Sequence, residues 1–401
     1  MQQKRTKILR YVLFAVVYFM EGGVLTFSSG FNALYLRSFD ISYSLIGIAG
    51  GIALLPFVLK IFIGFLSDRV NLFKLGHRKP FIILGLVIQT VGALLMPLVN
   101  PGLQFGLYIV GLLMVALGMS TYDTAADGLS IDTTPVEDRG LVQGLMVGGR
   151  ALSMVITAVL MGIFSQRGEW HSIFYMIAGM GVLTLILTLF VQEDKERAPG
   201  TEYSKAAFSA FKDIGFILFA IIGMIYPLAL YSAQGMVGAF LNEGLGIDLS
   251  TVGVYTSVFG IGTVAGGVIG GPLMKKIGER NSMLAAMVIT ALFTLILALT
   301  KSPLMMWAVV FMFGFSFGYY ETVYMAVGMD FADPRIAAFM FSVIMAVGNI
   351  GIAAGSPLAG VLVDKAGFGP MFIVFACVHL LVLPLVVILF KIRKRKAAQV
   401  I

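Results

Sequence analysis

Long apolar blocks separated by short polar turns constrain the fold of this chain more than any other feature. Examples are ILRYVLFAVVYFM at residues 8–20, FIILGLVIQTVGALLMPLV at 81–99 and MFIVFACVHLLVLPLVVILF at 371–390. A helix needs about 20 apolar residues to cross the hydrocarbon core of a bilayer. Only 12% of the residues are charged, against about 25% in a soluble domain. The blocks therefore predict an all-α integral membrane protein with many spans.

Counting the apolar blocks gives twelve predicted transmembrane helices. We place them at 8–36, 43–68, 79–99, 103–132, 139–165, 170–192, 214–241, 249–275, 281–299, 303–330, 335–363 and 369–391. The N-terminal MQQKRTKILR leads directly into the first span without a small-residue cleavage site. We therefore interpret it as the start of span 1 and not as a cleavable signal peptide.

The distribution of basic residues predicts the topology. With both termini in the cytoplasm, 22 of the 28 Lys and Arg residues fall on the cytoplasmic side and four in outer loops. Such a bias is the positive-inside rule, so the net charge of +7 indicates orientation and no nucleic-acid partner. The basic C-terminal KIRKRK is expected to anchor the last span at an anionic leaflet of the lipid bilayer. We expect a multi-pass protein of the cytoplasmic (inner) membrane, with a monomer as the working unit.

Internal similarity predicts two six-helix pseudo-repeats. The only long hydrophilic connection is 193–213, which divides the chain into bundles at 1–192 and 214–401. ISYSLIG at 41–47 resembles IDLSTVG at 247–253, and GFLSDRV at 64–70 is followed 207 residues later by GPLMKKI. Asp123 and Asp132 are likewise followed 198 residues later by Glu321 and Asp330. Repeats of this kind are common in transporters.

The connection between spans 2 and 3 carries a recognisable motif. GFLSDRVNLFKLGHRKP at 64–80 resembles the G-x-L-x-D-R-x-G-R-R/K signature of the major facilitator superfamily, with a five-residue insertion before its closing glycine. TPVEDRGLVQG and GSPLAGVLVDKAGFGPMF also resemble this superfamily. LPFVLKIFIGFLSDR and DTAADGLSIDTTPVEDRG are similar to the branch of muropeptide permeases, acetyl-CoA transporters and folate–biopterin transporters. The resemblance implies the major facilitator fold and secondary transport.

The same resemblance implies a cytoplasmic gate. Asp68 is expected to meet the positive end of a helix, or the neighbouring Arg69 and Arg78, and so to hold the cytoplasmic side shut. The gate residues are Gly64, Asp68, Arg69, Arg78 and Arg139. The alternative is that the basic residues only satisfy the positive-inside rule.

Six ionisable residues fall inside predicted spans: Glu21, Lys60, Asp123, Asp127, Arg150 and Glu321. Each costs ~2.5–3.5 kcal/mol to insert, so such residues usually face a cavity and have a function. Counting along the helices places Glu21, Asp123, Arg150 and Glu321 about 13–20 Å from the cytoplasmic ends, where transporter sites form. Asp132 lies at the membrane edge and is expected to cap or latch.

Four acids cannot all pair with two bases. We expect Arg150 to be the counter-charge of Asp123 and Asp127, while Lys60 either joins this site or extends towards the cytoplasmic interface. The leftover carboxylates are expected to bind protons, with Glu21, Asp123, Asp127 and Glu321 as proton-coupling residues. The bases would attract an anionic group of the solute. The alternative is a static ion pair that only fixes helix packing.

Polar and aromatic residues supply further candidates for solute binding. With Arg150 and Lys60, these are Tyr320, Tyr324 and Gln234. Core packing explains the tyrosines equally well, and Tyr18 and Tyr231 occur in similar positions.

The sequence thus favours a secondary transporter working by rocker-switch alternating access, with proton-coupled symport of an anionic or zwitterionic organic solute. An exporter, antiporter or uniporter of an amphiphilic solute and a non-transporting receptor remain alternatives. No G-x-x-x-x-G-K-[ST] motif is present, so the expected energy source is the transmembrane proton gradient, with no cofactor. His77, His171 and His379 do not converge on a nucleophile, which argues against an enzyme, and the single Cys377 argues against a metal site.

Overall fold

The computed structural model describes residues 2–70, 76–135, 138–193, 211–331 and 337–397. Within these ranges the chain is helical throughout, and twelve of its helical segments are long and apolar enough to cross a membrane. The predicted spans are confirmed to within a few residues at most of their ends. The regularity follows from the apolar blocks, because a backbone in lipid must satisfy its hydrogen bonds within one helix.

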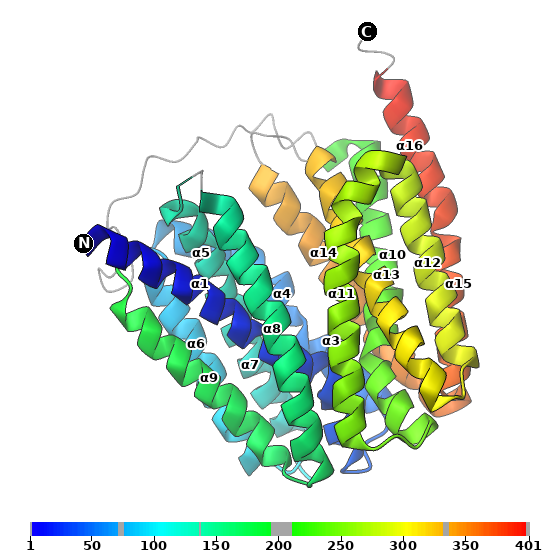
Figure 1. Cartoon of the computed structure of the whole chain (residues 1–401), viewed down its shortest axis with the longest axis horizontal. Helices are drawn as coiled ribbons and strands as arrows, with labels where there is room; N and C mark the ends of the chain where they lie inside the picture. The colour runs from blue at the N-terminus through cyan, green and yellow to red at the C-terminus, as the bar shows by residue number, and fades with distance from the viewer. Residues whose placement is uncertain (1, 71–75, 136–137, 194–210, 332–336, 398–401) are drawn as a thin grey trace. The chain divides into compact units, whose positions relative to one another are not determined.

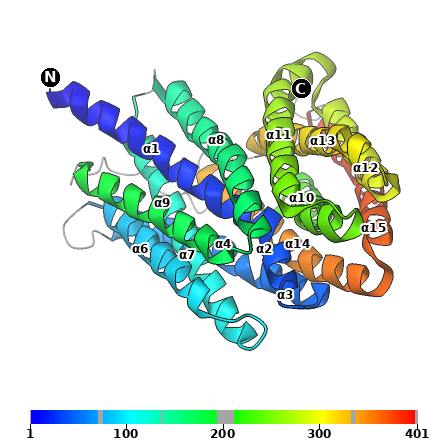
Figure 2. The same cartoon turned by 60° about the horizontal axis from the view of Figure 1, so that its bottom comes forward.

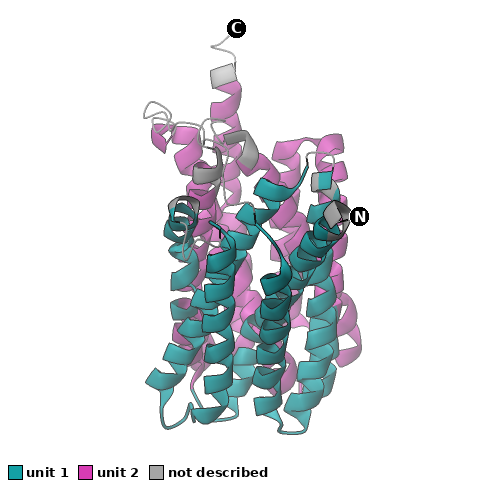
Figure 3. Cartoon of the chain, turned by 90° about the vertical axis from the view of Figure 1, so that its left-hand side faces the viewer, with its two compact units in different colours: residues 1–41, 52–200, 248–257 teal, residues 42–51, 201–247, 258–401 magenta. Residues whose placement is uncertain are grey.

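The helices pack into two compact units, which are coloured teal and magenta in Figure 3. Unit 1 comprises residues 1–41, 52–200 and 248–257, and unit 2 comprises 42–51, 201–247 and 258–401. Two short segments therefore pack with the opposite half of the sequence. The division at 193–213 stays a prediction about the repeats.

Unit 1 contains the helices of the N-terminal half (Figure 1). Their bounds are α1 Gln2–Thr26, a π-helical turn Phe27–Phe31, α2 Asn32–Arg37, α4 Leu55–Val58, α5 Lys60–Arg69, α6 Lys79–Leu95, a short 3-10 turn Met96–Leu98, α7 Phe105–Thr133, α8 Arg139–Gln166 and α9 Trp170–Phe190. Helix α1 packs along α8, and α6 packs against both α7 and α9 (Figure 2).

Unit 2 repeats this arrangement with the helices of the C-terminal half. Their bounds are α10 Ile214–Ala239, a π-helical turn Phe240–Gly244, α11 Leu249–Ile277, α12 Glu279–Leu299, α13 Pro303–Phe331, α14 Ala337–Ala366, α15 Phe368–Leu381 and α16 Leu383–Ala397, joined by most of α3 Tyr43–Ala53. Helix α10 packs along α14, as α1 does along α8, and α12 packs against α13 and α15.

Glycines allow the close helix contacts that position the polar groups of unit 1. A Cβ atom on Gly22 of α1 would lie 2.5 Å from the carbonyl oxygen of Arg150 on α8. On the same interface, a Cβ atom on Gly149 would lie 2.5 Å from the carbonyl oxygen of Ala15. Only glycine permits backbones to approach this closely. Helix α8 therefore presents Arg150 directly beside Glu21.

Large apolar side chains are exposed on the outer faces of the helices, while many polar ones are buried. Val268 and Leu304 are 70% and 82% exposed, whereas Glu21 and Asp123 are 6% and 5% exposed. A water-soluble protein would show the opposite trend. This distribution suits a chain whose outer faces meet lipid.

Candidate functional site

A network of five ionisable side chains lies inside unit 1. Glu21 comes from α1, Lys60 from the start of α5, Asp123 and Asp127 from α7, and Arg150 from α8. Of the six ionisable residues named above as lying within the spans, the structure thus brings together the five of the N-terminal half. Their contacts divide into two groups, joined through Tyr18.

The first group is the pair of Arg150 and Glu21. Arg150 donates hydrogen bonds from Nε and Nη2 to Glu21 Oε2, at 3.0 and 2.6 Å. The guanidinium also lies over the ring of Tyr18, 4.6 Å from its centroid. The Glu21 side chain is 8% exposed and that of Arg150 is 35% exposed. One edge of the guanidinium is therefore hydrogen-bonded to Glu21, while about a third of the Arg150 side chain stays exposed.

The second group is formed by Lys60 and two aspartates. Lys60 Nζ lies 2.5 Å from Asp123 Oδ2 and 3.7 Å from Asp127 Oδ2. Asp127 also accepts a hydrogen bond from Tyr18 Oη at 2.6 Å. Tyr18 therefore contacts both groups, with its ring against Arg150 and its hydroxyl on Asp127.

This pairing differs from the one expected from the sequence. Arg150 was predicted as the counter-charge of Asp123 and Asp127, but its hydrogen-bonded partner is Glu21, and Lys60 pairs with the aspartates. The prediction was wrong because it compared depths alone, whereas the glycine contact between α1 and α8 decides which acid Arg150 meets first. Lys60 joins the network instead of extending to the interface.

The network carries three carboxylates and two cations. With every group ionised it has one negative charge in excess, in surroundings where an uncompensated charge is costly. One added proton makes it neutral. An incoming anion brings a second negative charge and must compete with Glu21, Asp123 or Asp127 for the same two cations.

Unit 2 holds a single acid at the corresponding place. Glu321 on α13 accepts a hydrogen bond from the side chain of Tyr231 on α10. No ion pair to Glu321 is present among the residues that the structure describes. Gln234, one turn beyond Tyr231, is 9% exposed. Nothing cationic therefore balances Glu321 within the described part of unit 2.

The structure places Tyr320 and Tyr324 in the packed interior of unit 2. Tyr320 is stacked on Tyr226 and Tyr324 on Phe219, and the two tyrosines are 0% and 4% exposed. This geometry favours the core-packing alternative for both. Glu321 is less deeply buried than its two neighbours.

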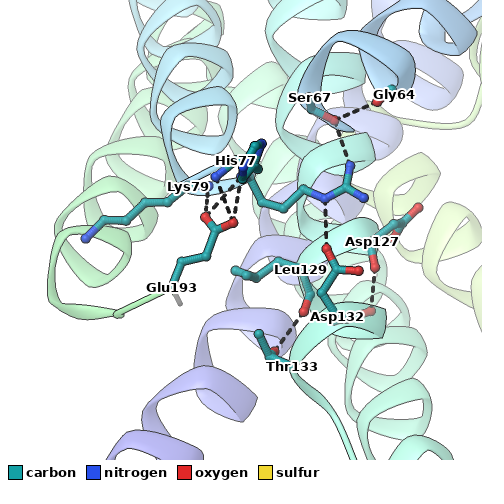
Figure 4. Close-up of polar contacts among 11 residues, drawn as sticks. Gly64, Ser67, His77, Lys79, Asp127, Leu129, Asp132, Thr133 and Glu193 are labelled. Atoms are coloured by element: carbon teal, nitrogen blue, oxygen red, sulfur yellow. Dashed lines mark hydrogen bonds and ion pairs between the residues drawn. The ribbon is translucent and has the colours of Figure 1, made fainter. Parts of the chain in front are cut away.

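A second polar group gathers at the end of unit 1 where α6 and α8 begin. Arg78 donates from Nε to Asp132 Oδ2 at 3.1 Å and from Nη1 to Ser67 Oγ at 2.7 Å. Ser67 in turn donates to the carbonyl of Gly64 at 2.9 Å (Figure 4). Asp132 thus holds α7 to the start of α6, in agreement with its expected role as a latch. The side chains of Asp68, Arg69 and Arg139 lie outside the described residues.

Sequence reasoning missed Glu193, which follows α9. Its carboxylate accepts hydrogen bonds from the backbone N–H groups of His77 and Lys79, at 2.9 and 2.7 Å, and from that of Arg78 (Figure 4). Unpaired N–H groups and the helix dipole favour an anion at a helix N-terminus. The available signal was an acid directly after span 6, but it was assigned to the hydrophilic connection.

The same end of unit 1 also ties α1 to the start of α8. Lys7 Nζ lies 2.5 Å from Asp138 Oδ2, and Tyr11 donates to the same oxygen at 2.7 Å. These two hydrogen bonds hold the pKa of the Asp138 carboxyl below its usual range. The contact is exposed, so it contributes little to stability.

Comparison with known proteins identifies the family. The model of the Major Facilitator Superfamily matches residues 14–234 and 219–400, which together cover nearly the whole chain. The chain belongs to the major facilitator superfamily. It is therefore a multi-pass secondary transporter of the inner membrane, and not an enzyme.

Individual relatives narrow the resemblance. The anhydromuropeptide permease of Escherichia coli K12 is 24% identical over 398 residues, covering 96% of this chain and 80% of that protein. The cis,cis-muconate transport protein of Acinetobacter baylyi is 22% identical over 356 residues, covering 84% and 81%. Among solved structures, a mutant of the nucleoside transporter NupG superposes with a TM-score of 0.78 at 15% identity, covering 96% of this chain and 100% of that one. The chain thus resembles the muropeptide permease branch, and its fold is that of solved transporters of the superfamily.

The repeat expected of this superfamily includes the polar site itself. Tyr18, Glu21 and Gly22 on α1 are followed 213 residues later by Tyr231, Gln234 and Gly235 on α10. Each tyrosine donates to an acid of the fourth span, but the two acids are one turn apart in the repeat: Tyr18 donates to Asp127, and Tyr231 to Glu321, which corresponds to Asp123. This Y-x-x-E/Q-G repeat was readable in the sequence and was overlooked.

Proposed function

We propose that this transporter carries an organic anion or zwitterion together with protons, as a symporter working by rocker-switch alternating access. The observation that carries the proposal is the network of unit 1, where three carboxylates share two cations. An anion that binds Arg150 or Lys60 must displace a carboxylate, and the displaced carboxylate must find another source of positive charge. A proton is the smallest such source.

Arg150 and Lys60 are equally accessible, with side chains 35% and 33% exposed, so the bonding of each cation decides which is the better candidate to receive the solute. Lys60 lies between two aspartates, whereas both hydrogen bonds from Arg150 to Glu21 end on a single oxygen, Oε2. A planar guanidinium can bind a second carboxylate in a bidentate manner. In the proposed cycle the solute carboxylate takes over Arg150, and Glu21 leaves it and takes up a proton.

Glu321 is proposed as the proton-carrying group of unit 2. It has a hydrogen bond from Tyr231 and no ion-pair partner within the described residues. An acid in such surroundings is most stable in its neutral form, and opening to water allows it to ionise. A change of access would then release its proton on one side of the membrane.

The names of the relatives support an acidic solute. A muropeptide is a peptide-bearing sugar, and cis,cis-muconate is a dicarboxylate. We propose the same chemical class here: a small organic molecule with at least one carboxylate. Arg150, Lys60 and Gln234 are the proposed contacts, with the pair of Tyr320 and Tyr324 as the wall behind Glu321.

The latch of Arg78 and Asp132 is proposed to close the end of the molecule that carries the basic residues. Together with Gly64, Asp68, Arg69 and Arg139 it would form the cytoplasmic gate. We propose a monomer as the unit that transports.

The first test is a screen of thermal stability in detergent against organic anions, zwitterions and neutral amphiphiles at pH 5.5 and 7.5. A ligand at 100 times its Kd stabilises the folded state by about 2.7 kcal/mol, enough for a clear shift in Tm. The proposal expects hits among carboxylates that disappear in Arg150→Ala and survive in Arg393→Ala. Arg393 is a matched control, because it is also paired with a glutamate, Glu279, at 2.5 Å.

A hit is then tested for transport in liposomes with an imposed pH gradient. Accumulation driven by an inward proton gradient supports symport. Accumulation driven by an outward proton gradient would identify an antiporter, and equilibration without accumulation a uniporter. Either result would replace the symport proposal.

A further inference from the structure

The N-terminus of helix α3 is capped by a carboxylate from a distant part of the chain. Asp364, near the C-terminal end of α14, accepts hydrogen bonds from the backbone N–H groups of Tyr43 at 3.0 Å and Ser44 at 2.7 Å. It also accepts one from Ser44 Oγ at 2.5 Å. The first N–H groups of a helix have no partner within it, and its dipole attracts negative charge there. Asp364 supplies both needs from another helix.

The two helices touch closely beside this cap. A Cβ atom on Gly47 of α3 would collide with the carbonyl oxygen of Ser356, and one on Gly360 of α14 with that of Tyr43. On Gly51 it would lie 2.6 Å from the carbonyl of Ala353. Residues 42–51 pack in unit 2 for this reason, whereas the chain that follows them packs in unit 1.

Unit 1 contains a corresponding crossing between α8 and the start of α11. Gln166, the last residue of α8, accepts a hydrogen bond from the backbone N–H of Leu249 at 2.8 Å. Gly162 and Gly253 allow close contact of these two helices. Ser257 adds a hydrogen bond to the carbonyl of Val155 at 2.8 Å.

The two crossings are equivalent by position in the repeat. Gln166 and Asp364 are 198 residues apart, the same separation as between Asp123 and Glu321. Each accepts hydrogen bonds from the first turn of the helix that opens with the repeated segment 41–47 or 247–253.

The carboxylate that caps the helix N-terminus comes from a different part of the chain at each crossing. Helix α11 is capped within its own segment by Asp248, whose Oδ1 accepts from the N–H of Thr251 at 2.9 Å. The equivalent residue before α3 is Ser42, with a weak contact of 3.4 Å to the N–H of Leu45. In unit 1 the charged cap therefore stays within one segment, and in unit 2 it connects two helices.

We infer that Asp364 is the principal latch that keeps the ends of α3 and α14 together during the transport cycle, and that Gln166 is a weaker, neutral latch at the equivalent crossing. The inference rests on the alternating access of the proposed function. Within unit 1, Gln166 is the last residue of α8, at the end opposite to the start of this helix near Arg78 and Asp132. A charge-assisted hydrogen bond is about twice as strong as a neutral one, so releasing Asp364 favours opening more than releasing Gln166.

The test measures how fast a cysteine within each crossing is alkylated in the purified protein. Ser356→Cys reports on the crossing of α3 and α14 and Ser257→Cys on that of α8 and α11, each in a Cys377→Ser background. We expect Asp364→Ala to raise both alkylation rates, about tenfold, and Gln166→Ala to raise them about threefold. Gln166→Glu adds a carboxylate to the helix N-terminus, so it should slow both rates.

The outcomes separate this inference from the proposed function, because alkylation requires no solute. Unchanged rates in Asp364→Ala overturn the latch, and so does a rise confined to Ser356→Cys, which indicates local fraying. Faster alkylation of the native Cys377 in Asp364→Ala would show general loosening and also overturn it. If Asp364→Ala does not fold, Gln166→Glu still decides, since a slower rate supports the latch and an unchanged or faster one contradicts it.

Discussion

The polar sites of the two units share a contact between a tyrosine and an acid but differ in their charges. In unit 1, Tyr18 donates to Asp127 within a network that includes two cations. In unit 2, Tyr231 donates to Glu321, and no ion pair to this acid occurs among the described residues. The tyrosine and the acid have been kept in both repeats, while the cations occur in one.

The repeat identifies the residues of the C-terminal half that correspond to Glu21, Arg150 and Lys60. Glu21 corresponds to Gln234, 213 residues later, and Arg150 to Gly348, 198 residues later. Lys60 corresponds to Gly266 or Gly267; at Gly266, α11 approaches α13 too closely for a side chain. Under the proposed function, unit 1 would bind the anion and unit 2 would carry a proton.

The largest effect is expected from Arg150→Ala, which breaks the network of unit 1. Glu21 would lose its cation while remaining buried, so the free energy of unfolding should fall by about 3 kcal/mol, and solute binding should be lost. Glu21→Gln combined with Arg150→Ala should recover most of the stability but none of the binding. Chemical denaturation and ligand-induced shifts in Tm measure the two effects.

Equal stability of Arg150→Ala and wild type would show that the pair with Glu21 is not maintained in the membrane protein. Arg393→Ala is the control, since it removes a pair at the surface, and its effect should be under about 1 kcal/mol.

The next effect concerns the proton. Glu321→Gln keeps the shape of the side chain and its bond with Tyr231 but cannot ionise. We expect uptake driven by a pH gradient to fall about tenfold or more, because general proton transfer through a carboxyl is lost, while exchange of solute between equal pools continues. Glu243→Gln, at an exposed carboxylate, should change neither. A variant that still concentrates solute against its gradient would remove Glu321 from the coupling mechanism.

The comparison can be tested by introducing into unit 2 an acid and a base at the positions that correspond to Glu21 and Arg150. Gln234→Glu alone places a second acid in the polar site of unit 2 and should lower the free energy of unfolding by about 1–3 kcal/mol. Adding Gly348→Arg should restore part of this loss, because α14 meets α10 as α8 meets α1, and a Cβ at Gly348 would have 3.5 Å to its nearest neighbour. Denaturant midpoints of the single and double variants give the coupling energy. A coupling of zero would refute the equivalence of the two sites.

The smallest effect is expected at the cap of α6. Glu193→Gln removes a charge from the helix N-terminus and should cost about 1 kcal/mol, seen as a lower Tm with solute binding intact. Glu169→Gln is matched to it, because Glu169 stands at the N-cap of α9 without a side-chain bond. Equal shifts in both variants would mean that the cap contributes nothing specific.

The spans could be predicted from the sequence because the bilayer requires about 20 apolar residues per helix, and charges within such runs are conspicuous. The sequence does not predict which of these charged residues pair with one another. Depth along a helix places Glu21, Asp123 and Arg150 at similar levels, but the rotation set by Gly22 and Gly149 decides that Arg150 meets Glu21. The burial of Tyr320 and Tyr324 likewise depends on stacking against Tyr226 and Phe219 from α10.

The most direct test of proton coupling is the number of protons taken up when a solute from the stability screen binds. Isothermal titration calorimetry near pH 7, repeated in buffers of different ionisation enthalpy, gives this number without a membrane. The charge balance of the network predicts uptake of about one proton per carboxylate bound, lost in Arg150→Ala together with binding. Binding of a carboxylate with no proton uptake at any pH between 5.5 and 7.5 would contradict the coupling of solute to protons.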